Sequence, residues 1–144
     1  MNAQKAVQAD ELKLKFQGDV LLCEDSAFSQ MLVKQDLVSL GANVHTCQNG
    51  QEAVDIIMKR AKNKKKPFDL VVMNIIMPVM DGLEAAQTLS WRGVKVPMVS
   101  FSSNTAPSDL ENYESYGMSN HLHKPYSKEE MIACLSKYLR AESL

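Results

Sequence analysis

The sequence contains no long hydrophobic run. Its clearest apolar stretches, residues 70–73 and 75–77, are separated by Asn74 and are far shorter than the about 20 residues that a membrane-spanning helix needs. The first sixteen residues mix charged side chains with small ones and lack the apolar segment of a secretory signal. We therefore expect a cytoplasmic chain that has no membrane-spanning segment.

Net charge and cysteine are also scarce. The formal net charge is -1, so the chain has no excess of positive charge with which to bind nucleic acid. The three cysteines, Cys23, Cys47 and Cys134, are odd in number and widely spaced, which indicates neither a disulfide framework nor a metal-ligand cluster. We expect reduced, buried thiols and no nucleic-acid partner.

The length and composition suit a single globular domain. The chain has 144 residues, of which 45% are hydrophobic and 23% are charged, and this size allows one compact core. We expect an N-terminal extension over residues 1–17, one folded domain over 18–140 and a short tail over 141–144.

Short apolar runs alternate with longer segments of helical periodicity. The runs that we predict as strands are 19–23, 43–47, 68–73, 97–101 and 121–123. Asn49, Ser108 and Ser127 are each followed three residues later by a glutamate, which is the capping-box pattern at the start of a helix. The alternation predicts an α/β fold in which helices cover both faces of a parallel sheet.

Polar side chains come at the ends of several predicted strands. Glu24 and Asp25 follow the first strand, Asn74 the third, Ser102 the fourth and Lys124 the fifth. In a doubly wound sheet the carboxyl ends of the strands form the ligand-binding edge, so we expect these side chains to lie together. Adjacent carboxylates are suitable ligands for Mg²⁺. The alternative is that Asp25 only caps the first helix and that Glu24 is merely solvated.

The order of four motifs resembles that of a known family. The motifs are ED at 24–25, DLVVMNIIMPVMDG at 69–82, PMVSFSSN at 97–104 and HKP at 123–125. Together they resemble the receiver domains of response regulators, most closely those of hybrid histidine kinases, over residues 18–139. The resemblance implies a flavodoxin-like, doubly wound sheet of five parallel strands in the order 2-1-3-4-5. It also implies a two-component phosphorelay module rather than an enzyme.

The resemblance assigns a metal site to the strand ends. It implies that Asp25 binds Mg²⁺ directly, that Glu24 acts partly through water and that Ile76 contributes its backbone carbonyl. Asn74 supplies an amide in place of a third carboxylate, so we expect its oxygen to be a further ligand and Mg²⁺ to bind only weakly.

The resemblance also assigns the residues that handle the phosphoryl group. The Ser102 hydroxyl would follow the phosphoryl group as a switch residue, and Lys124 would neutralise its oxygens. Pro125 would follow a cis peptide bond. His121 stands where the family often has an aromatic switch residue, and a histidine would make that contact sensitive to pH. The simpler alternative for His121 is a partly exposed strand residue.

Asn74 occupies the position of the family's phosphoacceptor aspartate. A neutral amide lacks the anionic oxygen that attacks phosphorus, so we expect this chain not to be phosphorylated. The expected partners are a histidine kinase or a histidine phosphotransfer domain, which would contact the first helix near Ala27, Phe28 and Met31.

Three functions are therefore compatible with the sequence. The first is a phosphorelay receiver that cannot accept phosphate in this form, and the second is a degenerate receiver that acts only as a protein-binding module. The third, a flavodoxin-like enzyme or cofactor binder, is disfavoured because an acidic EDS turn, rather than a glycine-rich loop, follows the first strand.

Overall fold

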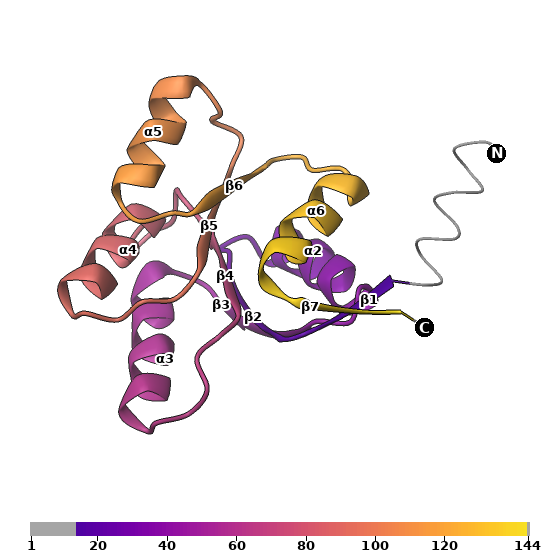
Figure 1. Cartoon of the computed structure of the whole chain (residues 1–144). Helices are drawn as coiled ribbons and strands as arrows, with labels where there is room; N and C mark the ends of the chain where they lie inside the picture. Colours follow the sequence, from indigo (N-terminus) through magenta and orange to yellow (C-terminus); the bar gives the residue numbers. More distant parts are fainter. Residues whose placement is uncertain (1–13, 144) are drawn as a thin grey trace.

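Five parallel strands form the central sheet of the computed structural model, which describes residues 14–143 (Figure 1). The strands are β2 (Asp19–Cys23), β3 (Asn43–Cys47), β4 (Leu70–Asn74), β5 (Met98–Ser102) and β6 (Asn120–His123). Their spatial order is β3-β2-β4-β5-β6. Counted within this sheet alone, that order is 2-1-3-4-5, so the predicted flavodoxin-like α/β fold is confirmed.

Helices cover both faces of this sheet (Figure 1). They are α2 (Ala27–Ser39), α3 (Gly50–Lys62), α4 (Gly82–Trp91), α5 (Pro107–Ser115) and α6 (Lys128–Tyr138). Residues of α2 and α6 share one hydrophobic cluster, and residues of α3, α4 and α5 share the other. The last turn of α3 carries three basic residues, Lys59, Arg60 and Lys62.

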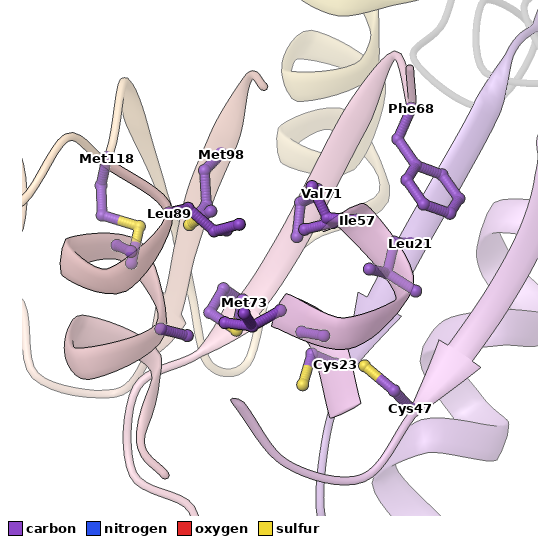
Figure 2. Packing of buried hydrophobic residues seen from close by; sticks show 14 of the residues in the cluster. Leu21, Cys23, Cys47, Ile57, Phe68, Val71, Met73, Leu89, Met98 and Met118 are labelled. Atoms are coloured by element: carbon purple, nitrogen blue, oxygen red, sulfur yellow. The ribbon is translucent and has the colours of Figure 1, made fainter. Parts of the chain in front are cut away.

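The two clusters arise because successive side chains of a strand point to opposite faces. Leu21, Val71 and Met73 belong to the cluster beneath α3 and α4, as Figure 2 shows. Val20 and Val72 belong to the other cluster. Every residue of β4 and β5 is buried, as expected for central strands that lie between two helical layers. The three cysteines are buried and free, which confirms that prediction.

Side chains cap most of the helices in the way the sequence indicates. Ser127 and Glu130 form the complete capping box predicted for α6, and Asn49 accepts a hydrogen bond from the Glu52 backbone N–H at the start of α3. The capping box predicted at Ser108 is wrong. Helix α5 begins at Pro107 without a side-chain cap, because a proline in the first turn has no N–H to satisfy.

A second, two-stranded sheet joins the two ends of the described chain. Strands β1 (Leu14–Gln17) and β7 (Arg140–Ser143) pair in antiparallel fashion (Figure 1). Phe16 of β1 is 1% exposed and packs in the cluster beneath α2 and α6. The segments expected to be an extension (1–17) and a tail (141–144) thus both contribute strands, which the sequence did not predict. Four-residue strands carry little periodicity of their own and are stable only when paired.

Within residues 14–143, none of the helices combines the length and the apolar character needed to cross a membrane.

Candidate functional site at the strand ends

The side chain of Asn74 lies at the centre of a polar cluster at the carboxyl ends of β2 and β4. Its amide nitrogen, Nδ2, donates hydrogen bonds to Glu24 Oε1 at 3.1 Å, to Asp25 Oδ1 at 3.0 Å and to the Ile76 carbonyl oxygen at 3.1 Å. Its amide oxygen, Oδ1, accepts a hydrogen bond from Lys124 Nζ at 3.0 Å. The structure therefore brings together all the predicted metal ligands, together with Lys124.

Glu24 is an integral part of this cluster, with only 2% of its surface exposed. Its Oε2 accepts a hydrogen bond from Lys124 Nζ at 2.9 Å, and its Oε1 accepts one from the Ser26 backbone N–H at 3.2 Å. Ser26, not Asp25, is the N-cap of α2. The alternative in which Asp25 caps the helix and Glu24 is solvated is therefore wrong, because the lysine and the neighbouring amides make burial of the carboxylate tolerable.

The loop after Asn74 is held in place because Gly82 packs closely against the backbone of Asn74 and Ile75. The Gly82 N–H donates to the Ile75 carbonyl at 2.9 Å, and a Cβ on Gly82 would lie 2.3 Å from the Asn74 carbonyl oxygen. Only glycine fits so close to this backbone. Asp81 accepts a hydrogen bond from the Glu84 N–H as the N-cap of α4, so its carboxylate has a structural role outside the cluster.

Lys124 reaches the cluster from the end of β6. Its ammonium forms an ion pair with Glu24 and lies 4.5 Å from the centre of the Phe101 ring, which favours a cation above its face. The peptide bond between Lys124 and Pro125 is cis. Two carboxylates and one ammonium leave the cluster with a net charge of -1.

The Ser102 hydroxyl and the His121 ring make their contacts outside the Asn74 cluster. The Ser102 carbonyl, in contrast, accepts a hydrogen bond from the Lys124 backbone N–H at 2.9 Å. The Ser102 hydroxyl bonds with the Tyr113 hydroxyl at 3.1 Å and with the Asn104 carbonyl at 3.2 Å. The His121 ring stacks on Tyr113, with ring centres 5.6 Å apart. Tyr113 thus connects the two predicted switch residues. No sequence signal pointed to Tyr113, because a buried tyrosine in an amphipathic helix is ordinarily a core residue.

The His121 ring is held by one hydrogen bond and by packing. Its Nδ1 lies 2.6 Å from Ser100 Oγ, whereas its buried Nε2 has no hydrogen-bond partner within residues 14–143. Burial, assisted by the nearby His123, lowers the pKa of His121 below its ordinary value of 6.5, and the backbone of Ser102 opposes this shift. The neutral imidazole is therefore the form that the fold favours.

This lowered pKa predicts that acid weakens the fold through His121. The unfolded chain binds a proton near pH 6.5, before the folded chain does, so the stabilisation is complete above pH 6.5 and is lost progressively as the pH falls toward the lower folded-state pKa. We expect a His121→Gln variant to lose less unfolding free energy than the parent between pH 7 and pH 5, measured by urea denaturation. A His45→Gln variant, which removes an exposed histidine of β3, is the control. Equal pH dependence of the parent and the His121→Gln variant would contradict this assignment.

The cluster matches a magnesium site in the chemistry of its oxygens but not in the position of its amide. Within the described part of the chain, no three His, Cys, Asp or Glu side chains are grouped as metal ligands. The oxygens of Glu24, Asp25 and Ile76 are hard ligands, which Mg²⁺ prefers. They surround an N–H donor, however, and the Asn74 oxygen that we predicted as a ligand faces Lys124 instead. Asn74 would have to move before a cation could contact all three oxygens.

Comparison with known families identifies this arrangement. The model of the response regulator receiver domain matches residues 20–136, which include the whole cluster. The chain belongs to the response regulator receiver domain family. Receiver domains of this family are signalling modules of two-component systems.

Relatives of this receiver domain occur both as small regulators and as parts of large kinases. It is 35% identical to a two-component response regulator of Oryza sativa subsp. japonica over 121 residues, which cover 83% of this chain and 92% of that protein. It is 26% identical to histidine kinase 5 of Arabidopsis thaliana, covering 90% of this chain but only 16% of the kinase. The activities of such longer proteins are therefore only proposals for this chain.

A solved receiver domain shares the fold. The receiver domain of a sensor histidine kinase from Pseudomonas aeruginosa, described with a magnesium ion coordinated in its active-site cleft, is 27% identical, with a TM-score of 0.70. The match covers 85% of this chain and 97% of that one.

Proposed function

We propose that this receiver domain binds a histidine kinase or a histidine phosphotransfer domain and does not accept a phosphoryl group at residue 74. The observation that carries the proposal is the state of Asn74, whose amide nitrogen and oxygen are both engaged within the cluster. An amide oxygen in this position carries no negative charge with which to attack phosphorus. The phosphoacceptor chemistry of the family is thus missing, although Glu24, Asp25 and Lys124 remain.

An apolar surface beside the site supports a role in partner binding. On α2, Phe28 is 68% exposed, and Met31 and Leu32 are also exposed. Next to them a groove of about 480 Å³ is lined by Leu32, Phe101 and Pro125, among others. Exposed aromatic and apolar side chains around a groove are typical of protein-binding surfaces. We propose that a helical partner packs here, as the resemblance implies for the first helix.

Two versions of this function differ in how much of the phosphorylation machinery the chain retains. In the first, the chain is a phosphorelay receiver in which one residue blocks phosphorylation, and in the second it is a pseudo-receiver that has lost more of the machinery. The retention of Glu24, Asp25, Ser102 and Lys124 favours the first version. The Asn74→Asp substitution separates the two versions, as argued below.

Magnesium and location complete the proposal. The magnesium ion of the P. aeruginosa receiver supports a cation site here, formed by Glu24, Asp25 and Ile76, and the amide at residue 74 makes that site weak.

We also propose a cytoplasmic location, since the three cysteines are free and the partners proposed are components of two-component signalling.

Phe28→Ala is expected to weaken binding to a histidine phosphotransfer domain of the same organism by at least tenfold. Anchoring aromatic residues at interfaces often contribute 2 kcal/mol or more, and a tenfold change corresponds to about 1.4 kcal/mol. The matched control is Trp91→Ala on α4, which removes an aromatic side chain of similar exposure, 78%, and should change the affinity less than twofold. Isothermal titration calorimetry measures both affinities.

The surface assignment also has a direct spatial test by amide hydrogen exchange. We expect the partner to protect the first turns of α2 and the loop after Lys124. Protection confined to the basic segment 62–66, at the end of α3 and in the loop after it, would count against the proposed surface, as would a larger loss of affinity for Trp91→Ala than for Phe28→Ala.

A further inference from the structure

The Asn74 amide nitrogen makes contacts of the kind that a bound cation would make. Three oxygens, from two carboxylates and one backbone carbonyl, lie between 3.0 and 3.1 Å from this one atom. Its N–H groups carry partial positive charge and point toward oxygens that a receiver would otherwise direct at a metal ion. The spacing suits N–H···O hydrogen bonds, whereas Mg²⁺ requires oxygens at about 2.1 Å.

The orientation of the amide follows from its neighbours. A reversed amide would place Oδ1 against the carboxylates of Glu24 and Asp25, which can only accept hydrogen bonds. It would also turn the NH₂ group toward the Lys124 ammonium, which can only donate. The observed orientation places the two N–H donors among three acceptor oxygens and the amide oxygen against the Lys124 ammonium, so Lys124 and the acidic pair together fix the nitrogen in its place.

The net charge of the cluster also disfavours a bound divalent cation. Two carboxylates and one ammonium give -1, and a divalent cation would turn this into +1 around the buried Glu24. With an aspartate at position 74 the same groups would give -2, which one divalent cation neutralises. An aspartate would thus match the charge of a divalent cation, whereas the amide leaves one positive charge in excess beside the buried Glu24 and disfavours the cation.

We infer that the Asn74 amide nitrogen takes the place of the divalent cation and competes with Mg²⁺ for the oxygens of Glu24, Asp25 and Ile76. The inference rests on the proposed function as a receiver that does not accept phosphate, and it adds that the site is held together without metal. Asn74 is thus a positioning residue that keeps the loops around the site in one arrangement when no cation is bound.

The decisive experiment removes the amide without adding a charge. If Asn74 competes with the cation, Asn74→Ala should bind Mg²⁺ at least threefold more tightly than the parent, as measured by calorimetric titration with MgCl₂. If Asn74 instead donates its oxygen to the cation, the same variant should bind Mg²⁺ more weakly. Weaker binding, equal binding or no binding in the variant would each overturn the inference.

A matched control removes a similar amide elsewhere. Asn43 Nδ2 donates to Asp19 Oδ1 at 2.9 Å near the opposite ends of the strands, so Asn43→Ala removes an amide-to-carboxylate bond of the same kind. Its Mg²⁺ affinity should equal that of the parent. An equal gain in Asn43→Ala and Asn74→Ala would show that general loosening, and not loss of competition, raises the affinity.

A second measurement keeps the inference testable if Asn74→Ala does not fold. In the folded parent, the side-chain NH₂ protons of Asn74 should exchange slowly with solvent in nuclear magnetic resonance spectra. Saturating MgCl₂ should accelerate that exchange, because the cation displaces the nitrogen. Exchange that is fast without metal, or that Mg²⁺ leaves unchanged, would overturn the inference. Partner binding, measured separately with Phe28→Ala, reports on the proposed function and does not depend on this result.

Discussion

Asn74→Asp is expected to produce a receiver domain that acetyl phosphate labels, whereas the parent is expected to stay unlabelled. Asparagine and aspartate have nearly the same shape, so the substitution should preserve the packing around β4. The new carboxylate would lie close to the Lys124 ammonium, which is 3.0 Å from the present Asn74 oxygen. One carboxylate oxygen would attack phosphorus, the bond from phosphorus to the acetyl oxygen would break, and acetate would leave.

The labelling should depend on magnesium and on this one position. We expect mass spectrometry to find one added phosphoryl group on the variant when acetyl phosphate and MgCl₂ are both present, and none on the parent. Asn104→Asp, which places a carboxylate in the loop after β5, is the control and should stay unlabelled. Labelling of the parent would show that the acceptor assignment is wrong.

The same variant distinguishes the two versions of the proposed function. A folded Asn74→Asp protein that binds Mg²⁺ but takes up no phosphate would show that the site has degenerated beyond one residue. Without magnesium, the third carboxylate should lower the stability, because like charges about 4 Å apart repel by about 1 kcal/mol in bulk water and by more near protein.

Lys124→Met is expected to lower the free energy of unfolding by about 3 kcal/mol. Methionine retains the apolar stem that packs near Phe101 but leaves the Glu24 carboxylate, which is 2% exposed, without its cationic partner. Removal of one partner from a buried ion pair typically costs 3–5 kcal/mol. The lower end applies because Glu24 still accepts hydrogen bonds from Ser26 and Asn74. Urea denaturation measures the change.

The control for this variant is a lysine in an exposed pair. Lys66 lies 3.7 Å from Asp69, and its side chain is 74% exposed. Such pairs contribute about 0–1 kcal/mol, so Lys66→Met should change the stability only slightly. Similar losses in Lys66→Met and Lys124→Met would show that the buried pair with Glu24 contributes no more than a surface pair.

The sequence determined the central sheet because its signals are local. Strands buried on both faces must be apolar along their whole length, as in β4 and β5, and a helix needs its cap residue a fixed distance ahead of its first turn, as Ser127 provides for α6. Local signals also failed where two neighbours competed, since Pro107 and not Ser108 sets the start of α5.

The sequence alone also predicted which side chains lie together at the strand ends. Glu24, Asp25, Asn74 and Lys124 each follow or end a strand, and parallel strands bring their carboxyl ends to one edge. That rule predicts only that these four side chains lie close together. Neither the orientation of the Asn74 amide nor the burial of Glu24 follows from it.

Tertiary structure decided these features, because they depend on groups far apart in the chain. The amide of Asn74 points its nitrogen at carboxylates about fifty residues earlier and its oxygen at an ammonium fifty residues later, so its direction is defined only after three strands have assembled. The stack of Tyr113 on His121 and the pairing of β1 with β7 likewise join separate segments. The sequence thus determined which chemical groups reach the strand ends, and the assembled fold determined that the amide nitrogen of Asn74, rather than its oxygen, faces the carboxylates.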